Sequence, residues 1–131
     1  MKIFRKWDQK LIDDDGCVMS KEAMSFYRAF KNYLKRNLPT DAELIGFKPN
    51  HYDTSGFVKL GDRYVYVSHN LRAGARTQAD FTRKDAFGGV LIRTAKSSKD
   101  YCGGRNQFTS INNLVDDILA LFENDREWEV A

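Results

Sequence analysis

The feature that most constrains the fold is a pair of β-prone runs, residues 56–60 and 63–68, which flank Gly61-Asp62. Two such runs around a two-residue turn that contains Gly are typical of a β-hairpin, because Gly adopts the positive φ that a tight turn needs. A two-residue turn also determines which residues face each other across the strands. The expected pairs are Leu60 with Arg63, Lys59 with Tyr64, Val58 with Val65, and Phe57 with Tyr66.

Alternation of side chains along the hairpin gives it two unlike faces. One face is aliphatic, and we expect helices to cover it: Val58, Leu60, Val65 and Val67. The opposite face is aromatic and basic: Phe57, Lys59, Tyr64 and Tyr66. Aromatic and cationic side chains together can stack on nucleic-acid bases or dock a protein. The alternative is a second small core under the N-terminal segment, because large aromatic side chains are normally buried.

Two segments have the periodicity of amphipathic helices. The first begins at Ser20, a favourable N-cap, and ends before Pro39, which stops a helix. The second spans residues 110–124 and has Thr109 or Ser110 as its N-cap. Apolar residues recur at helical spacing in both segments: Ala23, Phe26, Tyr27, Phe30, Leu34 and Leu38 in the first, and Ile111, Leu114, Val115, Ile118, Leu119 and Phe122 in the second.

Residues 41–48 and 90–95 are further β-prone runs, so the order of elements is helix, about four strands, helix. Short connections favour antiparallel pairing. The sequence therefore predicts an α+β fold, in which a mostly antiparallel sheet of about four strands carries an N-terminal and a C-terminal helix on one face. This outline is similar to the double-stranded-RNA-binding fold. Such domains contact phosphate through lysines at the start of the last helix, whereas residues 109–113 contain no lysine.

The length of 131 residues is enough for one domain with a substantial core. We expect residues 1–131 to form a single domain with an acidic C-terminal tail over about residues 123–131. No apolar run approaches the length of a membrane span, and residues 1–7 lack the apolar core of a signal peptide. We therefore expect a cytoplasmic protein in which Cys17 and Cys102 are free thiols.

The net charge of +3 is unevenly distributed along the chain. Residues 71–105 hold eight Lys/Arg against three Asp/Glu, whereas residues 106–131 hold one Arg against six Asp/Glu. Such asymmetry indicates a charged partner better than the net value does. The candidate basic residues are Arg72, Arg76, Arg83, Lys84, Arg93, Lys96, Lys99 and Arg105. The candidate acidic residues are Asp116, Asp117, Glu123, Asp125, Glu127 and Glu129.

The basic residues lie mainly in two loops, 69–87 and 96–107, which the strand over 90–95 joins. We expect the first loop to fold back along this strand, so that both loops and Arg93 form one basic surface. Gly103-Gly104 has the character of a loop that binds an anion ahead of a helix N-terminus. The phosphate-loop pattern is absent, however, and a plain strand-to-helix connection explains the Gly pair equally well.

Metal or enzymatic chemistry has little support in the sequence. His51 and His69 lie outside any metal-ligand spacing with the two cysteines. Cys102 could act as a nucleophile with one of the histidines as its base and Asp100 nearby, but an isolated Cys beside glycines is no signature of such a site. We therefore predict a protein that is not an enzyme and uses no metal or cofactor. A Cys102-dependent activity is the exception to test.

Three runs of the sequence carry a family resemblance: FVKLGDRYVYVS over 57–68, VLIRTAK over 90–96, and KDYCGGRN over 99–106. They resemble small uncharacterised proteins of conjugative and phage-derived elements of Gram-positive bacteria, over roughly residues 20–122. The resemblance implies a protein of a mobile genetic element, in the cytoplasm of a bacterial host, that helps to evade host defence as anti-CRISPR proteins do. No catalytic residues carry over, and the basic loop after His69 departs from the pattern.

Three functional hypotheses follow. The first is an inhibitor that binds a host nucleic-acid-targeting nuclease, such as a CRISPR effector, and presents its acidic tail to the nucleic-acid channel. The second is direct binding of DNA or RNA through the basic residues of segment 72–105, with Tyr64 and Tyr66 stacking on bases. The third is an enzyme that uses Cys102. The oligomeric state and the partner's identity do not follow from the sequence.

Overall fold

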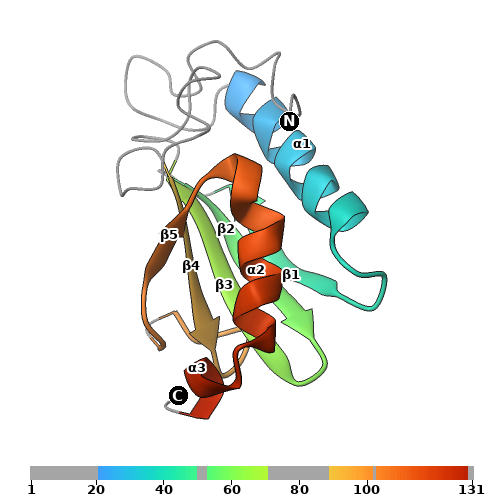
Figure 1. The fold of residues 1–131 in the computed structure, drawn as a ribbon. Coiled ribbons are helices and arrows are strands. Elements are labelled where there is room, and N and C mark those ends of the chain that lie inside the picture. The colour runs from blue at the N-terminus through green and yellow to red at the C-terminus, as the bar shows by residue number, and fades with distance from the viewer. Residues whose placement is uncertain (1–20, 50–52, 71–88, 102, 130–131) are drawn as a thin grey trace.

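In the computed structural model, the chain forms an α+β fold in which helices pack on an antiparallel sheet (Figure 1). The structure describes residues 21–49, 53–70, 89–101 and 103–129, and every structural statement below concerns these residues. The elements in chain order are α1 (Lys21–Asn37), β1 (Glu43–Pro49), β2 (Asp53–Leu60), β3 (Arg63–Asn70), β4 (Val90–Ala95), β5 (Gln107–Thr109), the 3₁₀ turn η3 (Ile111–Asn113), α2 (Leu114–Glu123) and α3 (Asp125–Glu129).

The strands follow one another across the sheet in the order β1-β2-β3-β4-β5, and each is antiparallel to its neighbours. The β2–β3 hairpin has the predicted register, with Leu60 opposite Arg63 and Phe57 opposite Tyr66. Gly61 makes the turn with a φ of 65°, which Gly adopts without strain. The predicted α+β class with an antiparallel sheet is therefore confirmed.

The sequence predicts about four strands, and the described part of the chain has a fifth, β5. This strand is three residues long and pairs with β4 at the edge of the sheet. Phe108 is its single large apolar residue, so the segment lacks the alternating pattern that identifies a strand. Hydrogen bonding to β4, rather than any local preference, orders β5.

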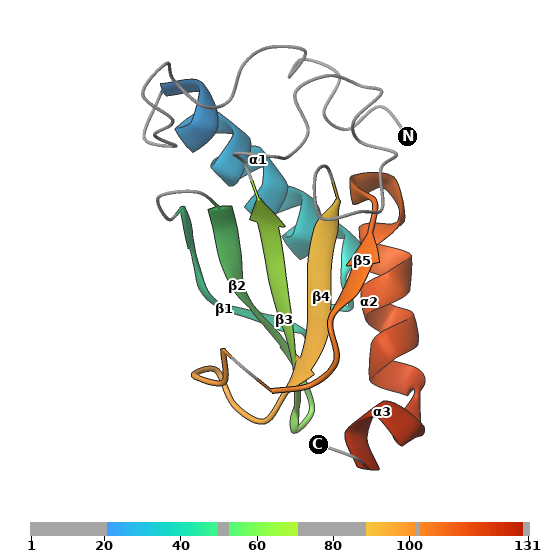
Figure 2. The same cartoon turned by 90° about the vertical axis from the view of Figure 1, so that its left-hand side faces the viewer.

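Both α1 and α2 lie on the same side of the sheet, as predicted (Figure 2). Phe30 and Leu34 of α1 are fully buried, as is Ile118 of α2. The aliphatic residues of the hairpin lie beneath them: Val58, Val65 and Val67, all at 0% exposure. Burying each side chain of this size stabilises the fold by roughly 1.5–3 kcal/mol, so this layer is the main source of stability.

A β-bulge in β1 adjusts the sheet to α1. The pairing of β1 with β2 is irregular between residues 45 and 48, and Gly46 within this interval has a φ of 67°. A bulge adds one residue and reverses the alternation of side chains. Leu44 and Phe47 therefore both pack on the helix side. Strand β2 accommodates the Phe47 ring with Gly56, where a Cβ would lie only 2.5 Å from that ring.

The C-terminal helical region begins at Ser110, whose hydroxyl accepts a hydrogen bond from the Asn113 N–H at 3.2 Å. The helix predicted over residues 110–124 is divided into η3 and α2, and α3 follows. Trp128 of α3 packs back against α2, where its ring stacks on Phe122 with centroids 5.9 Å apart. Its Nε1–H donates to the Leu121 carbonyl at 2.9 Å, which satisfies a carbonyl near the end of α2.

Candidate functional site

The candidate site lies on the side of the sheet turned away from α1 and α2, which we call the aromatic face (Figure 2). Register places the side chains of this face in three rows that run across the strands. The middle row consists of Ile45, Phe57, Tyr66 and Arg93. The flanking rows contain Lys59, Tyr64 and Ala95 on one side, and Ser55, Ser68, Leu91 and Phe108 on the other.

Three rings form an aromatic cluster on this face: Phe57 of β2, Tyr66 of β3 and Tyr101 of the β4–β5 loop. The ring centroids of Phe57 and Tyr66 are 5.2 Å apart, and Tyr101 lies 5.3 Å from Phe57 and 5.9 Å from Tyr66. Within the cluster, Phe57 is buried, whereas Tyr101 is 57% exposed. The aromatic cluster therefore presents the Tyr101 ring to solvent and holds it in place from below.

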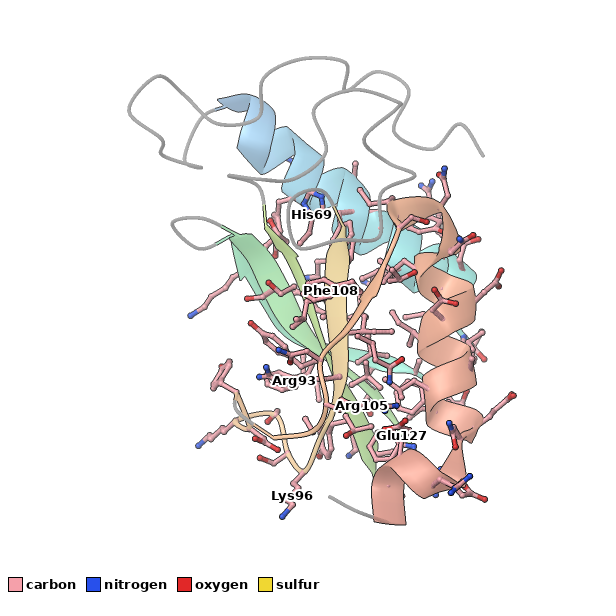
Figure 3. The ribbon with its side chains drawn as sticks, turned by 60° about the vertical axis from the view of Figure 1, so that its left-hand side comes forward. His69, Arg93, Lys96, Arg105, Phe108 and Glu127 are labelled. Atoms are coloured by element: carbon pink, nitrogen blue, oxygen red, sulfur yellow. The ribbon has the colours of Figure 1, made fainter. Side chains whose placement is uncertain are left out.

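Arg93 lies in the middle of the aromatic face, opposite Tyr66 (Figure 3). Its Cζ is 4.4 Å from the centroid of the Tyr66 ring, within the range of a cation–π contact. Only 8% of the residue is exposed, and within the described part of the chain its Nε and Nη2 have no hydrogen-bond partner. Buried donors without partners destabilise a fold, so these two N–H groups are candidates to bind an acceptor.

The carboxylate of Asp100 organises the loop that carries Tyr101. It accepts hydrogen bonds from the backbone N–H groups of Lys96, at 2.9 Å, and Gly103, at 2.7 Å. Gly104 then turns the chain with a φ of 75°, where a Cβ would clash with a backbone carbonyl of β4. The Gly103 N–H is thus occupied by the chain's own carboxylate, and the loop leads into β5. The expectation of a Gly loop directly ahead of a helix is therefore corrected.

Three lysines add positive charge around the aromatic cluster. The Nζ of Lys59 lies 5.7 Å from the centroid of the Tyr64 ring, on the row next to Tyr66. Lys96 and Lys99 are exposed on the β4–β5 loop, and Lys96 extends from the end of the sheet (Figure 3). Lys59 is half-buried, and the exposed Lys96 and Lys99 can attract an anionic ligand.

The other predicted basic residues do not join this cluster within the described part of the chain. Arg105 leaves the aromatic face and forms an ion pair with Glu127 of α3 (Figure 3). The remaining members lie outside the described residues: Arg72, Arg76, Arg83 and Lys84. The segment that contains them connects His69 and Val90, which pair at one end of β4, whereas Lys96 follows the other end. The single basic surface remains a prediction.

The predicted acidic tail is partly engaged within the molecule. Asp125 pairs with Arg63 at 2.9 Å, Glu127 pairs with Arg105, and Asp117 accepts a hydrogen bond from Thr109. The exposed acidic side chains of α2 are Asp116 and Glu123. The backbone of Glu129 belongs to α3, and its side chain is outside the described residues. The acidic surface is therefore smaller than the sequence suggests.

His69 belongs to the core on the helix side rather than to a surface site. It is fully buried, with its ring centroid 6.0 Å from that of Phe30, and burial lowers its pKa to about 4. His69 and the loop of Asp100 lie at opposite ends of β4, which a six-residue strand separates by roughly 20 Å. Cys102 and His51 lie outside the described residues.

The sequence does not predict that Tyr101 joins the aromatic cluster. Its contact with Phe57 depends on how Asp100 and Gly104 shape the β4–β5 loop, and no local pattern reports such a long-range contact. The sequence does identify Arg93 and places it on the strand over 90–95, but it groups Arg93 with the two basic loops, whereas the structure places it within the aromatic face. The hairpin alternation alone correctly places Phe57 and Tyr66 together.

Comparisons with protein-family models, curated proteins and solved structures found no match. Within the described ranges, no helix is long and apolar enough to cross a membrane. The same residues contain no group of three or more His, Cys, Asp or Glu side chains placed to hold a metal ion.

Proposed function

We propose that this protein binds single-stranded nucleic acid on the aromatic face. The observation that carries the proposal is the exposed Tyr101 ring, which rests on Phe57 and Tyr66 beside the buried guanidinium of Arg93. Proteins that bind single strands combine aromatic rings, on which bases stack, with cations that contact the phosphate backbone. The aromatic face brings both kinds of side chain together on a rigid sheet.

The arrangement favours a single strand over a duplex. Bases stack on an aromatic side chain only when they are unpaired and turned outward, as they are in single-stranded segments. Tyr101 offers such a ring, and Lys96 and Lys99 lie on the same loop to contact phosphates. Each phosphate that the protein neutralises contributes about −0.7 to the slope of log K against log salt concentration, so binding should weaken steeply with salt.

The test is fluorescence anisotropy with labelled single-stranded and duplex oligonucleotides at low salt. The decisive variant is Tyr101→Ala, and Tyr101→Phe is its matched control because it keeps the ring. Stacking contributes about 1–3 kcal/mol per base, so Tyr101→Ala should raise Kd by roughly 5- to 150-fold while Tyr101→Phe stays near the wild-type value. Absence of binding to any single strand at low salt would contradict the proposal.

A second proposal keeps the protein-inhibitor hypothesis and rests on the outer surface of α2. Asp116 and Glu123 are exposed there, and within the described residues neither forms an ion pair such as those that engage Asp125 and Glu127. Acidic side chains can occupy a cationic nucleic-acid channel of a nuclease. Binding and cleavage assays with a panel of purified CRISPR effector nucleases test this idea. Inhibition that the double variant Asp116→Lys/Glu123→Lys abolishes would support it, and no binding across the panel would contradict it.

A further inference from the structure

We infer that one edge of the Arg93 guanidinium is a preformed phosphate-binding site, which binds a single backbone phosphate of the bound strand. The inference deepens the proposed function and rests on it for the identity of the molecule that carries the phosphate. It assigns different roles to the two parts of the aromatic face. Tyr101 stacks on a base, and Arg93 fixes the position of the adjacent phosphate.

The geometry of the guanidinium carries the inference. Nε and Nη2 lie on one edge of this planar group, and within the described chain both lack hydrogen-bond partners. That edge donates two parallel N–H bonds, which match two oxygens of one phosphate or carboxylate group. The two unpaired donors of Arg93 therefore lie on the same edge of the guanidinium and can bind one group together.

The residues around Arg93 restrict the position of this edge before a ligand binds. Arg93 projects from the interior strand β4, where it pairs with Tyr66 of β3, and the pairing of β4 with β5 ends at the preceding residue, Ile92. The Tyr66 ring stacks against the guanidinium at 4.4 Å and restricts its rotation. A side chain whose position is fixed before binding loses little entropy when it binds, which favours affinity for a small group.

Charge favours phosphate over a neutral acceptor. Only 8% of Arg93 is exposed, and no residue in the described part of the chain forms an ion pair with it. A buried cation without an ion-pair partner is destabilising, and an anion offsets more of that penalty than a neutral acceptor does. A phosphodiester supplies the negative charge together with two oxygens at the right spacing, whereas a base edge supplies oxygens or nitrogens without charge.

Access to the edge requires a neighbouring side chain to move, because both nitrogens are buried. Tyr101 shares the Tyr66 ring with Arg93 and is 57% exposed on a loop. Of the rings in the cluster, Tyr101 is the exposed one, and we infer that it shifts when the ligand binds.

The test is a thermal-shift titration of the full chain with inorganic phosphate and with the dinucleotide UpU, against sodium chloride at matched ionic strength. Sodium acetate reports on carboxylate binding, and uridine reports on base binding without phosphate. The variants are Arg93→Met, which keeps most of the side-chain volume without charge, and Arg93→Lys, which keeps the charge without the two-donor edge. Arg28→Met, which removes one exposed cation from α1, is the matched control.

We expect phosphate and UpU to raise the Tm of the wild type and of Arg28→Met beyond the chloride baseline. Arg93→Met should melt about 3–5 °C higher than the wild type in chloride, because it removes a buried unpaired charge, and should gain nothing from phosphate. Arg93→Lys should bind phosphate at least tenfold more weakly than the wild type. Equal stabilisation of the wild type and Arg93→Met by phosphate would overturn the inference, as would a response to acetate that exceeds the response to phosphate.

A second measurement keeps the inference testable if Arg93→Met fails to fold. In ¹H–¹⁵N spectra of the wild type, the Arg93 Nε–H resonance should shift on titration with UpU and stay unchanged with uridine. The reverse pattern would contradict a phosphate contact. Oligonucleotide binding separates the two proposals: equal affinity of Arg93→Met and wild type removes the phosphate site alone, whereas phosphate binding without oligonucleotide binding removes the proposed function alone.

Discussion

The histidine beneath α1 ties the stability of the fold to pH. His69 is buried against Phe30, and burial lowers its pKa to about 4, below the value near 6.5 of an exposed His. Between these two values the unfolded state binds more protons than the folded state, so stability falls as pH falls. From pH 7 to pH 5 the expected loss from this one residue is about 2 kcal/mol.

Urea unfolding at pH 7 and pH 5 measures this loss. The control is His69→Phe, which keeps a ring of similar size in the core and cannot take up a proton. Its unfolding free energy should change much less over the same interval, because the carboxylates titrate mainly below it. An identical pH dependence in the wild type and in His69→Phe would show that another group is responsible.

At the scale of elements, the proposed binding depends most directly on the β4–β5 loop. Asp100 holds this loop through the N–H groups of Lys96 and Gly103, and so positions Tyr101. Asp100→Ala should raise the Kd for single strands about 3- to 10-fold, because a freed Tyr101 loses part of its stacking energy. Anisotropy gives the Kd, and Asp62→Ala in the exposed hairpin turn is the control.

Whether Asp100→Ala raises or lowers the Kd distinguishes two effects of this carboxylate. Asp100→Ala also removes a negative charge near Lys96 and Lys99, which by electrostatics alone would tighten binding to an anionic strand. Weaker binding therefore reports that Asp100 positions Tyr101. Tighter binding would mean that the conformation of the loop does not matter and that charge alone controls affinity.

The elements differ in how far the sequence predicts them. The hairpin register follows from Gly61-Asp62, and the buried faces of α1 and α2 follow from their apolar periodicity. β5 does not, because three residues carry no pattern and pairing with β4 orders them. The bulge at Gly46 and the contact of Tyr101 with Phe57 also depend on tertiary packing, so the sequence predicts two of the three rings of the aromatic cluster and misses the exposed one.

At the scale of the whole molecule, the C-terminal helix α3 connects the end of α2 to the hairpin. Arg63 donates to the Phe122 carbonyl at 2.7 Å, pairs with Asp125, and stacks over Trp128 with its Cζ 5.2 Å from the ring centroid. These contacts involve residues of β3, α2 and α3 and none of the aromatic cluster. Stability and binding should therefore be separable.

Trp128→Ala should lower the free energy of unfolding by about 2 kcal/mol, because it removes the stacking on Phe122 and the contact with Arg63. The Kd for single strands at 25 °C should stay within about twofold of the wild type, provided that the variant is folded. Urea unfolding and anisotropy on the same preparation check both expectations. A large loss of affinity in a folded Trp128→Ala variant would place the binding surface on the C-terminal side of the molecule.

The central claim is that nucleic acid contacts the aromatic face. Its most direct test is a ¹H–¹⁵N and ¹H–¹³C chemical-shift map of the wild type, titrated with an unlabelled single-stranded oligonucleotide at low salt. The account predicts that the largest shifts fall on Phe57, Tyr66, Arg93 and Tyr101, while α1 and α2 change little. Largest shifts on Asp116 and Glu123 of α2, or no shifts at saturating oligonucleotide, would contradict it.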